Sequence, residues 1–172
     1  MRSTPFIRQT IATPIGGLTL VARNDHLCMA EFADCEHRMD KWLRKRMARE
    51  KNQPTQGDVP RSIADAFASY FEGEIAVLDT ITVELSGTVF QNQVWTALRS
   101  LDPGQTLAYG AFAERLGRPQ AARAVGHANG ANPLSIVVPC HRLVGADGAL
   151  TKYGGGLWRK RWLLDHEGRH GA

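Results

Sequence analysis

The sequence predicts an α+β protein in which a small mixed α/β domain precedes a mainly helical domain. Three short runs of β-branched and apolar residues, interrupted by Pro, Gly and Asn-Asp, open the chain and predict strands. Amphipathic helical patterns fill most of the remainder. The pattern and the charge both change near Ser86 and Gly87, so we expect domains at residues 1–86 and 87–172.

The first half predicts a strand meander and two helices. We expect strands at residues 9–13, 18–23 and 27–32, a helix at 36–51, a loop at 52–60 and a further strand at 81–85. The second helix is indicated by apolar residues at i, i+3, i+4, i+7 and i+8, which are Ile63, Ala66, Phe67, Tyr70 and Phe71. No residue in this half has the pattern of a catalytic group.

The second half predicts a series of short helices. Thr88 and Gln91 fit a capping box that starts the first of them, and residues 102–104 stop it. Helices at about 109–116 and 120–128 are joined by a tight Gly-Arg-Pro turn. This arrangement is typical of a helix-turn-helix, although an ordinary helical hairpin has the same pattern.

The helix at 120–128 has an unusual composition, because it is almost free of bulky side chains apart from Arg123. Helices that read the major groove of DNA normally present long polar side chains. Small residues with one arginine suit close approach to the minor groove, where a side chain can wedge into the base stack. Tight helix packing with a solvated Arg123 would give the same composition.

Composition and charge restrict the class of protein. The 172 residues contain no apolar run long enough for a membrane span, and the start of the chain lacks a signal-peptide core. We therefore expect a cytoplasmic protein whose three cysteines stay reduced. Residues 1–86 have a net charge of −1 and residues 87–172 of +5, which favours a polyanionic partner for the second half.

The chemistry-bearing segment surrounds Cys140. We expect a buried strand at 136–138 that leads directly into Cys140 and His141. A buried cysteine beside a histidine is more often inert packing, but Glu167 could orient His141 as the third member of a relay. A second group of thiols and imidazoles, consisting of His26, Cys28, Cys35 and His37, lacks a convincing zinc pattern, so we expect no metal.

Residues 138–142 (Val-Pro-Cys-His-Arg), 153–157 (Tyr-Gly-Gly-Gly-Leu) and 159–160 (Arg-Lys) carry a resemblance to a known family. They resemble the O6-alkylguanine-DNA alkyltransferases, also called methylated-DNA–protein-cysteine methyltransferases, of the constitutive bacterial type. The likeness spans residues 88–168, and the first half matches loosely through residues 11–16. It implies a ribonuclease H-like first domain and a winged-helix-like second domain that contains a helix-turn-helix.

The resemblance also implies roles for individual residues. Cys140 would accept the alkyl group, His141 would take its proton through a water molecule, and Glu167 would hold His141. Asn132 would join the helix-turn-helix to the active-site segment, and Tyr109 would donate to the guanine ring.

Further residues would meet the DNA and the flipped base. The damaged nucleotide would flip out of the duplex, because a base inside the stack cannot reach a buried thiolate. Arg123 would then fill the gap that the nucleotide leaves. Ala122, Ala124 and Gly126 would let the helix lie in the minor groove. The guanine pocket would be lined by Leu143, Tyr153, Gly154 and Lys160. Lys152, on the pocket lip, and Gly154 depart from residues common in the family, and Gly154 would remove a possible contact.

The implied activity is direct reversal of DNA damage. One alkyl group would move irreversibly from O6-alkylguanine, and also from O4-alkylthymine, to Cys140, without a cofactor. The implied partner is double-stranded DNA with alkylated bases, bound by a monomer that could cooperate with other copies on DNA. Two alternatives are a non-catalytic lesion binder, which would lack the acceptor thiol, and a thiol hydrolase, which would need an oxyanion hole.

Overall fold

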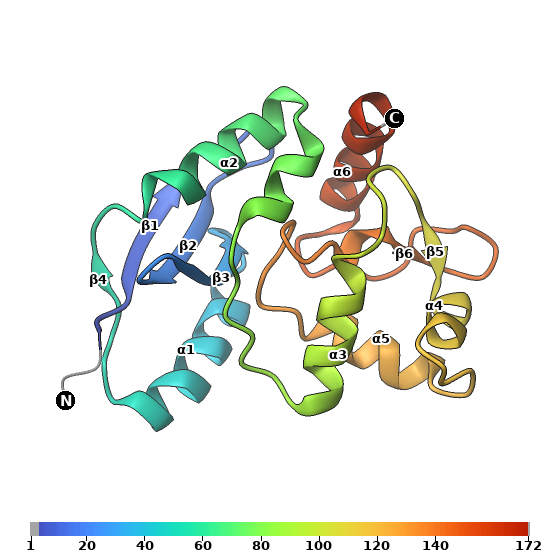
Figure 1. Ribbon diagram of the computed structural model, residues 1–172, viewed down its shortest axis with the longest axis horizontal. Coiled ribbons are helices and arrows are strands. Elements are labelled where there is room, and N and C mark those ends of the chain that lie inside the picture. Colours follow the sequence, from blue (N-terminus) through green and yellow to red (C-terminus); the bar gives the residue numbers. More distant parts are fainter. Residues whose placement is uncertain (1–3, 172) are drawn as a thin grey trace.

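The computed structural model describes residues 4–171 and consists of a sheet-containing half and a helical half (Figure 1). β1 (Ile7–Ile11), β2 (Leu18–Arg23) and β3 (His26–Phe32) form an antiparallel meander, and β4 (Thr55–Gln56) pairs in parallel with β1. The sheet order is β3-β2-β1-β4. The expected meander is therefore confirmed, with its first strand two residues earlier than the pattern predicts.

Two helices, α1 (Glu36–Glu50) and α2 (Arg61–Glu72), pack on this sheet (Figure 1). Successive side chains of a strand point to opposite faces. Leu20 of β2 accordingly joins the core cluster that contains Phe67 of α2, whereas Val21 joins the cluster that contains Met39 of α1. Because both faces are covered, β2 is apolar almost throughout and lacks a clear alternation.

Of the segments that flank α2, the one after it differs from the expectation, and the one before it is a loop as expected apart from one short strand. A 3₁₀ helix, Ile75–Thr80, follows α2, and residues 81–85 contain only a single bridge, between Val83 and Leu27, in place of a strand. Arg99 donates to the carbonyls of Leu78 and Ile81, which secures the end of the 3₁₀ helix. The expected loop at 52–60 contains the short strand β4.

The helical half contains α3 (Val89–Leu98), α4 (Tyr109–Arg115), α5 (Ala122–Gly130) and α6 (Leu157–His170). The capping box of α3 is confirmed, because Gln91 N donates to Thr88 Oγ1 at 3.1 Å and Thr88 N donates to Gln91 Oε1 at 2.9 Å. α4 and α5 pack together across a turn in which Gly117 has a φ of +72°. This pair forms the expected helix-turn-helix, with α5 beginning two residues later than predicted.

The segment before Cys140 also differs from the expectation. Residues 136–138 are buried as predicted, but they form a turn and not a strand. Ile136 adopts a φ of +74°, and Val138 N donates to Leu134 O at 2.9 Å. An apolar run indicates burial, and it cannot by itself distinguish a strand from a buried turn. A short parallel pair, β5 (Leu107–Ala108) with β6 (Leu143–Val144), was not anticipated.

The two halves share one large hydrophobic core. It includes Leu20 and Phe67 from the first half and Val125 and Leu163 from the second.

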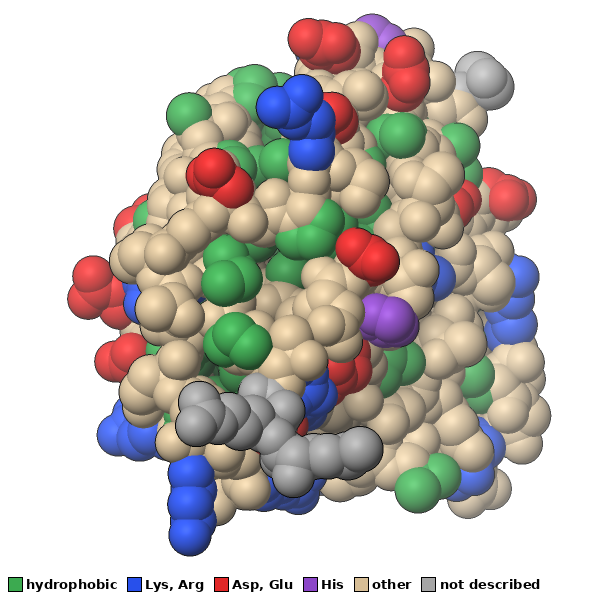
Figure 2. Space-filling view, turned by 60° about the vertical axis from the view of Figure 1, so that its left-hand side comes forward, with side chains coloured by type: hydrophobic (Ala, Val, Ile, Leu, Met, Phe, Trp, Pro, Cys, Tyr) green, Lys and Arg blue, Asp and Glu red, His purple; other side chains and the backbone are tan. Residues whose placement is uncertain are grey.

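On the face formed mainly by the first half, acidic side chains lie mostly toward the upper and left edges, and most Lys and Arg side chains lie toward the lower and right-hand edges (Figure 2). Within residues 4–171, no helix is long and apolar enough to cross a membrane.

Candidate functional site

Cys140 begins a 3₁₀ turn, Cys140–Arg142, which connects the buried turn to β6. Cys140 is only 6% exposed. Asn129 of α5 donates to the Cys140 carbonyl at 3.2 Å, so the helix-turn-helix directly holds the backbone of the thiol-bearing residue. A fixed backbone keeps the sulfur in one position, which a displacement reaction requires.

His141 and Glu167 form the expected pair. His141 Nε2 lies 2.7 Å from Glu167 Oε1, and both side chains are fully buried. An ionised carboxylate can only accept, so Nε2 carries a proton and donates to Glu167. Nδ1 is buried and has no hydrogen-bond partner among the described residues. The arrangement therefore fixes the His141 ring through Nε2 and leaves Nδ1 available for a hydrogen bond or a proton transfer.

Glu167 receives two further donors. Arg142 donates to both of its oxygens, from Nε at 2.9 Å and from Nη2 at 3.1 Å. Tyr70 of α2 donates to Oε1 at 2.9 Å. Burial acts to raise the pKa of the Glu167 carboxyl, but His141 and Arg142 outweigh burial and hold that pKa well below its usual range. Glu167 is therefore a charged, fully engaged acceptor.

Tyr70 belongs to the candidate site through its hydrogen bond to Glu167, although its place in an apolar stripe indicated only a core residue. Its side chain is fully buried, and burial together with Glu167 raises the pKa of its hydroxyl well above the usual value. It therefore stays protonated as a donor. A tyrosine in an apolar stripe needs a partner for its hydroxyl, and that requirement is the signal that could have identified it.

The thiol of Cys140 is not activated in advance. Burial raises its pKa, and the Asn132 side chain, Arg38 and Lys160 oppose that rise without cancelling it. Cys140 is consequently a protonated thiol in the free protein, and it needs a base when it reacts.

Asn132 links α5 to the thiol-bearing segment, as the resemblance implied. Its Nδ2 donates to Val138 O at 2.9 Å, and its Oδ1 accepts from Leu134 N at 2.9 Å. The residue is completely buried. Both bonds close the turn in which Ile136 has its left-handed conformation, so Asn132 stabilises the approach to Cys140.

Three of the expected pocket residues lie beside this cluster. Lys160 of α6 is fully buried and donates to Leu143 O at 2.6 Å and to Thr151 O at 3.1 Å. Burial lowers the pKa of its amine. The Tyr153 ring meets the His141 ring edge to face, with centroids 6.4 Å apart. Lys160 thus ties β6 to the loop that carries Tyr153.

A separate cavity of about 580 Å³ lies on the side of α5. Its lining includes Tyr109, Arg123, Gly126, Thr151 and Lys152. Arg123 and Ala124 are exposed, and Ala122 and Gly126 are half-buried. The Tyr109 hydroxyl accepts from Thr151 Oγ1 at 3.2 Å. The structure therefore separates two groups of expected residues, the enclosed Cys140 cluster and the open Arg123 face.

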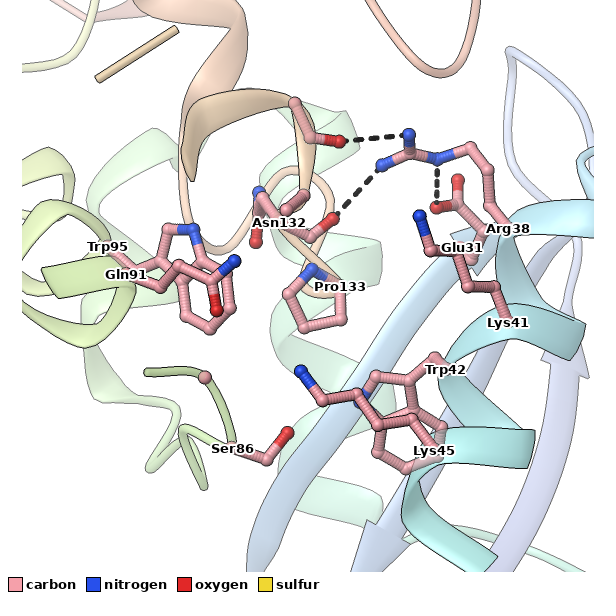
Figure 3. A pocket seen from close by; sticks show the side chains of 13 residues that line it. Glu31, Arg38, Lys41, Trp42, Lys45, Ser86, Gln91, Trp95, Asn132 and Pro133 are labelled. Carbon is pink, nitrogen blue, oxygen red and sulfur yellow. Dashed lines mark hydrogen bonds and ion pairs between the residues drawn. The ribbon is translucent and has the colours of Figure 1, made fainter. Parts of the chain in front are cut away.

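Arg38 of α1 is the second residue that the sequence analysis missed. It donates to Glu31 at 2.9 Å, to Gly130 O at 3.0 Å and to Asn132 O at 3.2 Å (Figure 3). A Cβ at Gly154 would lie 2.5 Å from its guanidinium carbon. Gly154 therefore leaves the space that the Arg38 guanidinium occupies, a role that its sequence context did not indicate.

The four residues weighed as zinc ligands remain apart. Within residues 4–171, no group of three or more His, Cys, Asp or Glu side chains is placed to hold a metal ion. Cys28 instead interacts with Glu84, and burial raises its pKa to about 12.

Both halves of the chain match the two domains of one protein family. A model described as "6-O-methylguanine DNA methyltransferase, ribonuclease-like domain" matches residues 6–85. A second model, described as "6-O-methylguanine DNA methyltransferase, DNA binding domain", matches residues 89–169. The chain belongs to the 6-O-methylguanine DNA methyltransferase family.

Individual relatives agree along nearly the whole chain. The methylated-DNA–protein-cysteine methyltransferase of Salmonella typhimurium is 47% identical over 164 residues, which cover 95% of this chain and 96% of that protein. The same-named protein of Mycolicibacterium paratuberculosis is 44% identical, over 94% of this chain and 92% of that protein. The crystal structure of Mycobacterium tuberculosis O6-methylguanine methyltransferase superposes with a TM-score of 0.78 at 38% identity, covering 98% of this chain and 95% of that one.

A complex with nucleic acid is among the similar structures. Mycobacterium tuberculosis OGT in complex with DNA has a TM-score of 0.77 and 38% identity, and the match covers 95% of this chain and 94% of that one. The two-domain α+β fold predicted from the sequence is thereby confirmed.

Proposed function

We propose that this protein repairs DNA by moving an alkyl group from the O6 atom of guanine to Cys140 Sγ. The observation that carries the proposal is the buried Cys140–His141–Glu167 cluster within a chain of this family. His141 Nδ1 takes the thiol proton, either directly or through a water molecule, and Glu167 stabilises the imidazolium that forms. The related reaction with O4-alkylthymine needs the same groups.

The transfer is a displacement at carbon. The thiolate of Cys140 attacks the alkyl carbon as the bond from that carbon to O6 breaks, and the electron pair of the broken bond stays on guanine. Guanine then takes up a proton, for which the Tyr109 hydroxyl is our proposed donor. The product on the protein is a thioether. The His141 imidazolium then releases its proton to solvent, and the Tyr109 phenolate takes one back from solvent, so the reaction balances without a cofactor.

The base must leave the duplex to reach the enclosed thiol, since Cys140 is 6% exposed. We propose that α5 enters the minor groove through Ala122, Ala124 and Gly126, and that Arg123 replaces the flipped nucleotide in the stack. The exposure of Arg123 supports this role. Leu143, Tyr153, Gly154 and Lys160 form our proposed guanine pocket.

Three further proposals concern the domain boundary, the oligomeric state and the cellular compartment. The domain boundary lies between residues 86 and 87, as the charge and the sequence pattern suggest. The protein binds each lesion as a monomer and can cooperate with further copies along the duplex. The reaction requires a free thiol, which supports a reducing compartment such as the cytoplasm.

The test replaces the acceptor atom. Cys140→Ser should retain binding to a duplex with O6-methylguanine and lose methyl transfer, because a hydroxyl is far less nucleophilic than a thiolate. Intact mass and peptide mapping of the wild-type protein should place one methyl group on Cys140. Cys28→Ser is the matched control and should transfer normally. Label on Cys28 or Cys35, or transfer by Cys140→Ser, would refute the assignment.

A further inference from the structure

A second cavity continues from the α5 cavity toward the first half of the molecule. It measures about 300 Å³ and lies between α1 and α3 (Figure 3). Lys41, Gly130 and Ala131 line both this cavity and the one beside Arg123. The two spaces are therefore neighbouring parts of one groove, which we call the α1 groove where it passes α1.

One stripe of α1 faces the α1 groove. Arg38, Lys41, Trp42 and Lys45 recur at i, i+3, i+4 and i+7, and all four line the cavity. In Figure 3 the Lys45 amine points into the space between α1 and the side chains of Ser86 and Gln91. The stripe is thus built from one continuous helical face.

The charge of this stripe is only partly neutralised. Glu31 is the one acidic residue that lines the α1 groove in the described part of the chain, and Arg38 already holds it at 2.9 Å. Lys41 and Lys45 are exposed, and neither forms an ion pair within residues 4–171. The α1 groove consequently presents two cations with no acidic partner.

Helix α1 is the basic exception within an otherwise acidic half. It contains six Lys and Arg against three Asp and Glu, whereas the other residues of 1–86 contain five against nine. In Figure 1 α1 and α5 lie on the same lower side of the molecule, and α2 lies above. The positive charge of the first half is therefore concentrated next to the proposed DNA-binding helix.

We infer that the α1 groove binds the DNA backbone where the strand passes the α5 cavity, and that Lys41 and Lys45 each neutralise one phosphate. The inference rests on the proposed function. A phosphodiester strand is the polyanion that such a groove fits, and Lys is a common phosphate ligand. The two lysines lie about 6 Å apart along the helix axis, so their flexible stems can reach neighbouring phosphates.

The inference predicts a specific change in salt dependence. Each neutralised phosphate contributes about −0.9 to the slope of log K against log salt concentration. With an unmodified duplex, Lys41→Gln/Lys45→Gln should bind with a slope about 1.8 shallower than that of the wild-type protein. Each single variant should account for roughly half of this change.

A matched variant removes the same charge elsewhere. Arg61→Gln/Arg169→Gln changes two exposed arginines on α2 and α6, away from the α1 groove. Its slope should stay close to that of the wild type. Equal slopes for the two double variants would overturn the inference, because the effect would then be one of net charge alone.

A conservative variant separates phosphate binding from packing. Lys41→Arg/Lys45→Arg keeps both charges, so its slope of log K against log salt concentration should equal that of the wild type. A slope as shallow as that of Lys41→Gln/Lys45→Gln would contradict phosphate contact. The proposed function is judged separately, by methyl transfer from a methylated duplex to the wild-type protein. Absence of that transfer would refute the repair activity, whereas the slopes alone decide the role of the α1 groove.

Discussion

At the scale of single residues, the site is organised around Glu167. Its carboxylate accepts hydrogen bonds from Tyr70 of α2 and from His141 and Arg142, which lie in one 3₁₀ turn. A buried charge is tolerated only when it is paired and fully hydrogen-bonded, and each of these donors contributes to that requirement. Glu167 can therefore orient His141 only as well as Tyr70 and Arg142 orient Glu167.

Tyr70→Phe tests this dependence. The change removes one hydrogen bond to a charged group, which should cost about 1.5–3 kcal/mol of stability. It should also slow alkyl transfer, because the carboxylate that fixes the His141 ring becomes less constrained. Thr10→Val is the control, since it removes a hydroxyl whose partner is Thr19 in the sheet of the first half. A wild-type transfer rate for Tyr70→Phe would show that the hydroxyl serves stability alone.

Glu167 should also make stability depend on pH. Its folded-state pKa is depressed below the unfolded value of about 4.3, so its contribution is complete above that pH and is lost as the pH falls toward the folded-state pKa. Glu167→Gln leaves the Arg142 charge unpaired and should cost roughly 3–5 kcal/mol at pH 7.

Thermal melts between pH 7 and pH 3 measure this difference. The difference in melting temperature between the wild type and Glu167→Gln should stay constant down to about pH 5 and should then become smaller. Glu114→Gln, at an exposed position of α4, should show little gap at any pH. A gap that widens in acid would mean that the carboxyl is protonated in the folded protein at neutral pH.

At the scale of elements, the sequence predicted the helices better than the buried connections. Periodic stripes and a capping box are local signals, and they placed α1 to within one residue and the start of α3 at its capping box. The same stripe placed the end of α3 too late, because the helix ends at Leu98 and not at the predicted stop at 102–104. The apolar runs at 81–85 and 136–138 indicated burial correctly and strand conformation wrongly. The conformation of the second run depends on bonds from Asn132 and on a left-handed Ile136, which no short pattern encodes.

The candidate site divides in the same way. Cys140, His141 and Glu167 were identified from their motif and chemistry, and the structure brings them together. Tyr70 and Arg38 were missed because their partners are 97, 92 and 94 residues away along the chain. Such partners become visible only when the first half packs against the second.

Helix α5 carries the prediction that belongs to this scale. Arg123→Ala should slow repair of duplex DNA about tenfold or more, because nothing then offsets the few kcal/mol lost on unstacking the flipped base. Reaction with free O6-benzylguanine requires no flipping and should change far less. Rates with both substrates, with Arg169→Ala as an exposed control, measure the contrast. Equal losses on the two substrates would assign Arg123 to the pocket or the fold.

At the scale of the whole molecule, the thiol lies where the two halves meet. Arg159 of α6 donates to Ile15 O and pairs with Asp34, while Arg38 joins α1 to the carbonyls of Gly130 and Asn132. The shared core adds apolar contact between the same halves. Arg38 and Glu31 of the first half also act on the Cys140 thiol, so we expect a change in volume at Cys140 to affect both halves.

Alkyl transfer should stop at one equivalent per protein molecule and should leave that molecule less stable. The thioether carbon has a poor leaving group, and the other two cysteines, Cys28 and Cys35, are buried at positions in the first half. An added methyl group in a site that is 6% exposed should cost on the order of 1–3 kcal/mol. Titration of methylated duplex against protein, with thermal melts of the free and reacted protein, tests both statements. Repeated turnover would refute irreversible transfer, whereas an unchanged melting temperature would show that the pocket already has room for the methyl group.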